Sequence, residues 1–167
     1  MSQVADREDL KKLRSLIEDV EIGMLTTSTD GGSLRSRPMV TAQVEPGGSL
    51  WFFTAFDAPK VDQIEGDAAV NVAYSEPKSQ TYVSVSGRAK VRRNRDKIDE
   101  LWSPAAKAYF PEGKDDPNFA LLEVTIDGAE YWDAKRSRMV QLFQMAKGAM
   151  TGRQPDMGES RKMKVNA

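Results

Sequence analysis

Short turn sequences divide the middle of this chain, and they limit its fold more than any other feature. Asp30-Gly31-Gly32, Pro46-Gly47-Gly48 and Glu76-Pro77-Lys78-Ser79 each leave only a few residues between one apolar stretch and the next. Gly, Pro and Asp are the residues that tight turns require. Because parallel neighbouring strands need a crossover of about a dozen residues or more, these connections favour antiparallel pairing over a parallel βαβ fold.

The stretches around these turns have the apolar or alternating pattern of strands. We expect strands at 22–27, 33–45, 49–56, 68–75, 80–93 and 119–127. Six antiparallel strands with such short connections predict a small closed barrel, a mainly β (α+β) fold with peripheral helices.

Helical spacing accounts for most of the remaining chain. We expect helices at 4–20, at 58–65 and around 94–109, the last interrupted at Ser103-Pro104. Residues 110–118 are predicted to be loop, and residues 139–150 either strand or helix. A length of 167 residues fits a single domain over 1–167, with a polar tail from about 150 to 167.

The chain contains neither histidine nor cysteine. This composition excludes Ser-His-Asp and cysteine nucleophiles, disulfides and the ordinary zinc sites. Demanding chemistry would therefore need a bound cofactor. Without disulfides, without an apolar run of the ~20 residues that span a bilayer, and without a signal-like N-terminus, we expect a cytoplasmic protein with no membrane partner.

Charge argues against nucleic acid as a partner, because the net charge is only −1. The basic run from Arg88 to Arg95 lacks interleaved aromatic residues and is predicted to be a solvated strand end. Any anion site must therefore be local.

One local candidate combines two strand arginines with a lysine. Arg35 and Arg37 share a strand face just before Pro38, and Lys60 opens the short helix that follows the next strand. Helix N-termini and arginines both suit phosphate. The alternative is that these cations are solvated residues that protect an edge strand.

Aromatic residues supply apolar surface near these cations. Trp51 and Phe53 are expected on one strand face and Phe52 on the other, and most such residues form core. Tyr131 and Trp132, after the strand at 119–127, fit a pocket rim as well as a core. Apolar surface beside converging cations is typical of a site for a planar ligand that carries phosphate.

Five motifs in the same order and spacing resemble a known family: RSRPM, LWFFTAFDAPKVDQI, YVSVSGRA, LWSPAAKAYFPEGKDDP and AEYWD. They are similar to the general stress protein 26-like group of the pyridoxamine 5′-phosphate oxidase-related flavoproteins, over about residues 6–160. The resemblance implies a split barrel, a homodimer, and flavin mononucleotide (FMN) bound at the dimer interface.

The resemblance also implies the parts of the site. Arg37 and Lys60 match the residues that meet the flavin phosphate, and Arg35 and Ser36 are neighbours with a weaker match. Two groups match the positions beside the flavin ring. They are Pro38, Met39 and Val40, whose backbone lines the ring, and the pair Phe53 and Thr54.

Two more residues match positions that the partner subunit contributes in this family, Tyr82 and Trp132. The chain departs from the oxidase itself after Trp132, where DAKRSRMVQLF lacks histidine and the expected late arginine falls near Leu142. Pro59 also replaces an arginine beside the phosphate lysine. Vitamin B6 oxidation is therefore not expected, whereas the residues that match the flavin site are intact.

The resemblance favours a flavin-dependent oxidoreductase of unnamed substrate. The alternatives are a flavin-binding sensor without turnover and a protein of the same fold that uses a deazaflavin cofactor. Haem is disfavoured because histidine, its common ligand, is absent.

Overall fold

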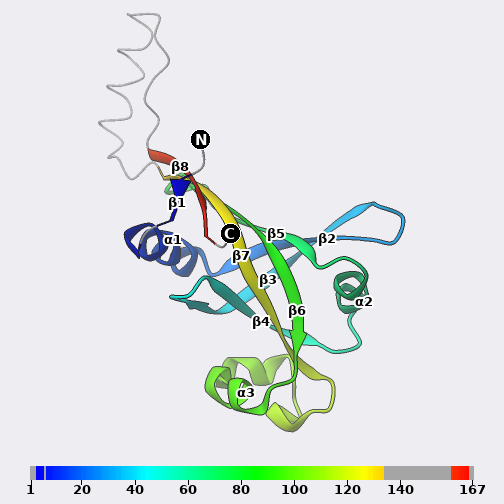
Figure 1. The fold of residues 1–167 in the computed structure, drawn as a ribbon. Coiled ribbons are helices and arrows are strands. Elements are labelled where there is room, and N and C mark those ends of the chain that lie inside the picture. Colours follow the sequence, from blue (N-terminus) through cyan, green and yellow to red (C-terminus); the bar gives the residue numbers. More distant parts are fainter. Residues whose placement is uncertain (1–2, 6, 134–158, 166–167) are drawn as a thin grey trace, which may run out of the picture.

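The six predicted strands form a closed antiparallel barrel (Figure 1). The computed structural model describes residues 3–5, 7–133 and 159–165. Neighbouring strands follow the order β7-β4-β3-β2-β5-β6, and pairing between β6 and β7 closes the ring. The strand bounds are β2 (Ile22–Ser28), β3 (Leu34–Glu45), β4 (Ser49–Ala55), β5 (Ala69–Glu76), β6 (Thr81–Arg92) and β7 (Phe119–Asp133). The predicted fold class is confirmed.

Helices surround the barrel. Helix α1 (Arg7–Val20) and helix α2 (Pro59–Gly66) lie on opposite sides of it in Figure 1, and α3 (Arg95–Leu101) lies below it. Two short 3-10 turns, η1 (Pro104–Ala108) and η2 (Gly113–Asp115), continue the connection from α3 to β7. The predicted interruption at Ser103-Pro104 separates α3 from η1, and the predicted loop at 110–118 contains η2. None of the helices in the described part of the chain is long and apolar enough to cross a membrane.

The core consists of two apolar clusters. Residues from every barrel strand fill the interior, among them Leu25, Phe52, Tyr74, Val85 and Leu122. A second cluster lies between β4, the start of β7 and the α3–η1 segment, and is made by Trp51, Ile98, Phe110, Phe119 and Leu121. Phe52 thus faces the barrel interior while Trp51 faces the second cluster, with Phe53 packed against that cluster. The predicted alternation along this strand is confirmed.

Strand β7 is longer than the sequence pattern predicted. It continues beyond residue 127 to Asp133, so Tyr131 and Trp132 lie within the strand and Tyr131 is part of the core. The buried carboxylate of Asp133 accepts a hydrogen bond of 2.5 Å from Lys12 of α1, which ties the far end of β7 to that helix.

The predicted polar tail contains a strand, β8 (Glu159–Lys164), which pairs antiparallel with the second half of β7. A two-residue strand, β1 (Gln3–Val4), pairs parallel with β8. Met163 is buried against the core, and Arg161 forms an ion pair of 3.0 Å with Asp9 of α1. The predicted element at 139–150 lies outside the described residues.

A bulge marks the place where β7 changes partners. Gly87 of β6 pairs with Ile126, but Ser86 pairs with Gly128, so Asp127 is an extra residue. Before the bulge β7 pairs with β4, and after it β7 pairs with β8. Bulges bend the strand that contains them, so this one directs the second half of β7 away from β4 while β7 stays paired with β6.

Candidate functional site

Strands β3 and β4 separate from each other halfway along their length, and the gap forms a pocket. Their pairing ends at the Thr41–Phe52 pair, next to a register shift between Thr41 and Gln43. Among the strands that the structure describes, the preceding part of β3 pairs only with β2, and the end of β4 pairs only with β7. Both strands therefore present an edge to the gap without a strand partner there.

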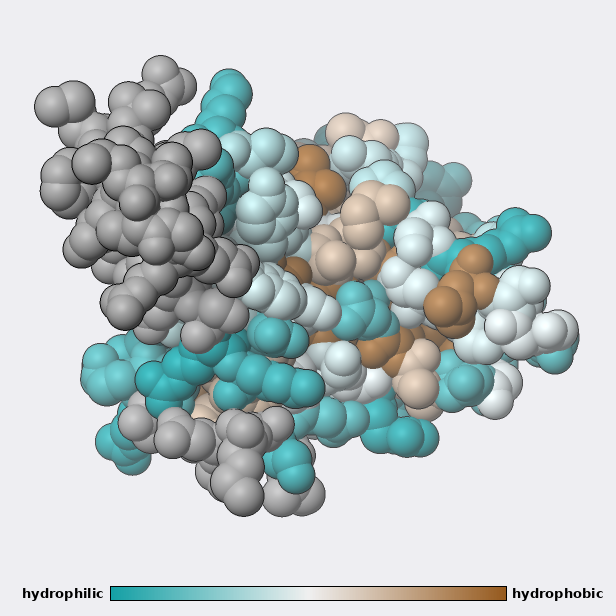
Figure 2. Space-filling model, turned by 90° about the horizontal axis from the view of Figure 1, so that it is seen from above, coloured by the Kyte–Doolittle hydropathy of each residue, from teal (hydrophilic) through white to brown (hydrophobic). Residues whose placement is uncertain are grey.

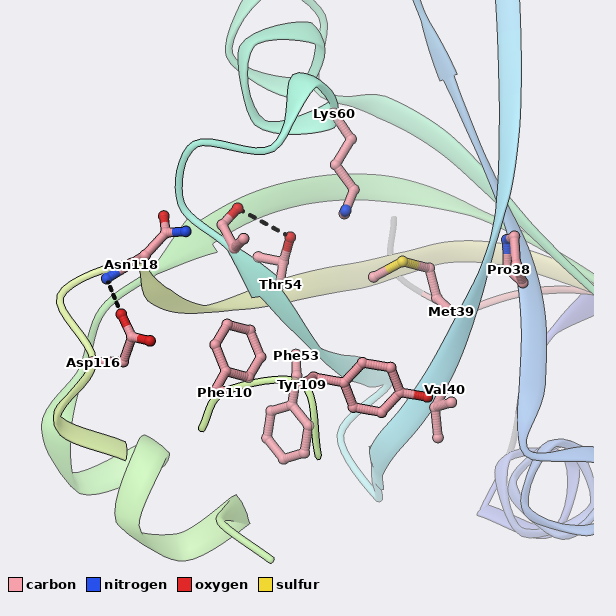
Figure 3. Close-up of a pocket in the computed structure, with 11 residues that line it drawn as sticks. Pro38, Met39, Val40, Phe53, Thr54, Lys60, Tyr109, Phe110, Asp116 and Asn118 are labelled. Atoms are coloured by element: carbon pink, nitrogen blue, oxygen red, sulfur yellow. Dashed lines mark hydrogen bonds between the residues drawn. The ribbon is translucent and has the colours of Figure 1, made fainter. Parts of the chain in front are cut away.

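The pocket has a volume of about 400 Å³ and is lined by three groups of residues (Figure 3). One wall comes from β3, the opposite wall from β4, and the rest from α2 and the segment that leads into β7. The lining residues are Pro38, Met39, Val40, Phe53, Thr54, Ala55, Lys60, Tyr109, Phe110, Asp116 and Asn118. The walls are largely apolar, and the amino group of Lys60 extends from α2 into the space between them.

Lys60 is a partly buried cation without an acidic partner among the residues that the structure describes. Its amino group forms no hydrogen bond or ion pair with any side chain in the described part of the chain. Burial, and after it the positive charge of Arg37, lowers the pKa of the Lys60 amino group. Both causes disfavour an isolated cation, so an anion placed here would relieve them.

Arg37 is held beside this site by three hydrogen bonds. Its guanidinium donates to the Leu25 carbonyl oxygen at 3.3 Å, to Thr27 Oγ1 at 2.7 Å and to Gln63 Oε1 at 3.0 Å. Burial and the neighbouring charge of Arg35 lower the pKa of Arg37. All of these acceptors are neutral, so the positive charge of Arg37 is uncompensated within residues 7–133.

Helix α2 adds to the positive potential. Pro59 occupies its first turn, and Ala58 at the N-cap provides no side-chain hydrogen bond. Proline is favoured at this position because its missing N–H would have no helical partner. The start of α2, which carries the partial positive charge of a helix N-terminus, therefore lies on the same turn as Lys60, an arrangement that suits anions.

Six of the eleven residues predicted for the site line this pocket: Pro38, Met39, Val40, Phe53, Thr54 and Lys60. Arg37 lies beside it under α2, and Arg35 is exposed next to Arg37. Ser36 lies outside the pocket, where its hydroxyl is hydrogen bonded to Thr26 Oγ1 at 2.7 Å. Pro38 remains in register with Met24 of β2, so the proline does not interrupt the pairing of β3 with that strand. The edge of β3 that has no strand partner here is the one that faces β4.

Tyr82 and Trp132 do not line the pocket of this chain. They are direct cross-strand neighbours on β6 and β7, and they are 40% and 41% exposed. Strands β5 and β2 lie between Tyr82 and the β3 wall of the pocket, and Trp132 lies in the half of β7 that pairs with β8 and not with β4.

Five lining residues were not predicted from the sequence: Ala55, Tyr109, Phe110, Asp116 and Asn118. Asn118 is fixed by Asp57, whose backbone N–H donates to Asn118 Oδ1 at 3.1 Å and whose carboxylate accepts from Asn118 Nδ2 at 2.9 Å. Phe110 packs edge-on against Phe119 with ring centroids 4.5 Å apart. The one feature of the sequence that could have indicated these residues is the aromatic pair at 109–110, in a segment otherwise rich in turn residues.

The described residues contain no group of three or more acidic, histidine or cysteine side chains placed to hold a metal ion. The site therefore offers cations, backbone edges and apolar walls.

Comparison with known proteins agrees with this geometry. The family described as pyridoxamine 5′-phosphate oxidase like matches residues 8–156. General stress protein 26 of Bacillus subtilis is 27% identical over 141 residues, which cover 82% of this chain and 98% of that protein.

Two solved structures extend the comparison. The structure of a putative general stress protein 26 from Jannaschia sp. CCS1 is 28% identical, has a TM-score of 0.76, and covers 94% of this chain and 99% of its own. The general stress FMN/FAD binding protein of Xanthomonas citri is 31% identical with a TM-score of 0.67, over 79% of this chain and 93% of that one. By sequence and by fold, the chain belongs to the pyridoxamine 5′-phosphate oxidase-like family.

Proposed function

We propose that this chain binds FMN in the pocket between β3 and β4 and acts as a flavin-dependent oxidoreductase. The observation that carries the proposal is the pair formed by Lys60 and Arg37, two partly buried cations with no acidic partner among the described residues, next to an apolar slot. The related Xanthomonas citri protein, an FMN/FAD binding protein, supports the same ligand class.

The residues present fit a flavin. Lys60, Arg37 and the start of α2 would hold the phosphate by charge-assisted hydrogen bonds. The unpaired edges of β3 and β4 offer backbone groups for the polar edge of a ring, and Met39, Val40 and Phe53 offer apolar surface for its faces. A volume of about 400 Å³ lies within the range of about 300–1,000 Å³ usual for small-molecule sites.

In this proposal the protein positions the cofactor and does not itself provide the redox chemistry. Bound flavin supplies hydride or electron transfer. Lys60 and Arg37 neutralise the phosphate, and the apolar walls exclude water from the ring. Asp116 and Tyr109 also line the pocket, beside the residues that would hold the flavin.

The first test is the colour of the protein. We expect the purified protein to be yellow, or to become so on addition of FMN, with about one flavin retained per chain after gel filtration. Failure to take up FMN under native conditions would contradict the proposal, and uptake of a deazaflavin in its place would assign the other cofactor class.

Turnover is tested on the FMN-loaded protein. We expect NADH or NADPH to bleach the flavin absorbance in an anaerobic stopped-flow experiment. A flavin that binds tightly but is not reduced by either donor, although chemical reduction succeeds, would assign a sensor or carrier instead.

We further infer a homodimer. Hydrophobic side chains are exposed on the outer face of β2 and β3, with Ile22 53%, Met24 42% and Val40 51% exposed. Ile22 pairs with Val40, and Met24 with Pro38, so they form one patch. Figure 2 shows hydrophobic residues reaching the surface between polar ones. A partner on this patch would bring its own Tyr82 and Trp132 to the flavin.

Met24→Lys tests the dimer. We expect the wild-type protein to have twice the chain mass of 18.6 kDa by light scattering, and Met24→Lys to shift it toward the single-chain mass. FMN retention should fall in parallel, because the partner's residues complete the site. Phe56→Lys is the matched control, since Phe56 is also 42% exposed but lies after β4, away from the patch. A wild-type protein of single-chain mass that still binds FMN would contradict the dimer.

A further inference from the structure

A second recess opens beside the pocket between β3 and β4. It has a volume of about 210 Å³ and lies between the end of β3 and the α3–η1 segment. Thr41 and Ala42 form one side, and Leu101, Ala105 and Ala106 form the other. A cavity of about 150 Å³ is enough for benzene, so this recess has room for a compound of one or two rings.

The two recesses share a wall. Val40, Phe53 and Tyr109 line both of them. Figure 3 shows the hydroxyl end of the Tyr109 side chain directed toward Val40. A ligand in the second recess would therefore lie in contact with the same three side chains as the flavin ring proposed for the first.

The chemistry of the second recess differs from that of the first. No residue that lines it carries a side-chain charge at neutral pH, whereas the first contains Lys60 and Asp116. A charged ligand would lose its hydration without gaining an ionic partner, which is unfavourable.

Three hydroxyl groups provide the polar character of this recess, those of Thr41, Ser103 and Tyr109. The hydroxyl of Thr41 is already hydrogen bonded to the Tyr74 hydroxyl at 2.8 Å. Ser103 stands at the N-cap of η1, but its side chain makes no capping hydrogen bond. Ser103 can therefore donate to or accept from one polar group of a ligand.

We propose that this recess is the substrate subsite, and that the substrate is a small uncharged aromatic compound with one hydroxyl or carbonyl group directed at Ser103. That the recess holds a substrate rests on the proposed flavin site. Whether the recess binds a neutral aromatic compound can be measured separately.

The test uses FMN-loaded protein and two probes of equal ring size, 2-naphthol, which is neutral, and 2-naphthoate, which is anionic. Ligand-observed NMR titration should show saturable binding of 2-naphthol and much weaker binding of 2-naphthoate. Ala105→Trp should weaken 2-naphthol binding by about tenfold or more, because the indole fills the apolar space that the probe would occupy. Ala108→Trp is the control, since Ala108 is exposed on the same 3-10 turn but lines neither recess.

Ser103→Ala should weaken 2-naphthol several-fold, by the loss of one hydrogen bond. The subsite is overturned if 2-naphthol does not bind the wild-type protein, if Ala105→Trp and Ala108→Trp bind it equally well, or if 2-naphthoate binds as tightly. FMN absorbance is recorded for every sample. If the wild-type protein takes up no FMN, the flavin proposal is contradicted. If that protein nevertheless binds 2-naphthol and Ala105→Trp does not, the recess remains an aromatic-binding site.

Discussion

Replacing Gly87 with alanine is expected to lower the free energy of unfolding by roughly 3 kcal/mol or more, a large part of the stability of an ordinary domain. A Cβ atom on Gly87 would lie 2.2 Å from the carbonyl oxygen of Thr125 and 3.1 Å from Val124 Cγ1. The first contact is with backbone, so no change of rotamer can relieve it. The bulge between β6 and β7 would have to shift, and with it the point where β7 separates from β4.

Urea and thermal unfolding followed by circular dichroism measure this effect, and the melting temperature should fall by roughly 6–12 °C. Gly47→Ala is the matched control, because a Cβ on Gly47 meets no atom within 4 Å. Alanine there should be neutral or slightly stabilising, since it restricts the unfolded chain. Equal stability of the Gly87→Ala and Gly47→Ala proteins would show that the bulge adapts freely.

The barrel strands could be predicted because their signals are local. Along β6, Val83 and Val85 alternate with Ser84 and Ser86, and the structure buries the valines. A half-buried strand requires this period of two wherever it lies in the fold. The turns that contain Gly and Pro likewise specify antiparallel neighbours without knowledge of the rest of the chain.

Strand β8 could not be predicted in the same way. Its sequence ESRKMK contains one large apolar residue, Met163, and otherwise has the composition of a solvated tail. The strand forms because the second half of β7, after leaving β4, has an edge free to accept it. That edge exists only once the bulge at Asp127 has redirected β7, and an Asp-Gly pair in the sequence is more typical of a turn than of a strand interior.

The candidate site also has a part that could be predicted from the sequence and a part that could not. The walls from β3 and β4 and Lys60 were predicted, because these residues lie close together in the sequence and match the motifs of the family. Tyr109 and Phe110 reach the pocket only because the segment after β6 folds back onto Phe119, where Trp102 and Phe110 both pack edge-on. The position of this segment depends on the tertiary packing of its aromatic rings, which the helical spacing at 94–109 does not predict.

Lys60→Ala is expected to weaken FMN binding by about 1–3 kcal/mol, or roughly 5- to 150-fold in dissociation constant. The amino group has no competing acidic partner among the described residues, so its interaction with phosphate is not offset by the loss of an existing ion pair. Titration of FMN into the flavin-free protein, followed by quenching of flavin fluorescence, measures the change. Lys107→Ala is the control, because Lys107 is an exposed lysine on η1 that lines neither recess.

The pH dependence separates a charge effect from a packing effect. Burial and Arg37 lower the pKa of Lys60 in the free protein, and a bound phosphate would raise it again. The protonated form binds phosphate more tightly, so wild-type affinity is full below the pKa of the free protein and falls as the pH rises through it. Lys60→Ala should lack this fall, and Lys60→Arg, which stays charged, should lack it while keeping most of the affinity. An alkaline decline that persists unchanged in Lys60→Ala would assign the titrating group elsewhere, and an unchanged affinity in that variant would remove Lys60 from the phosphate site.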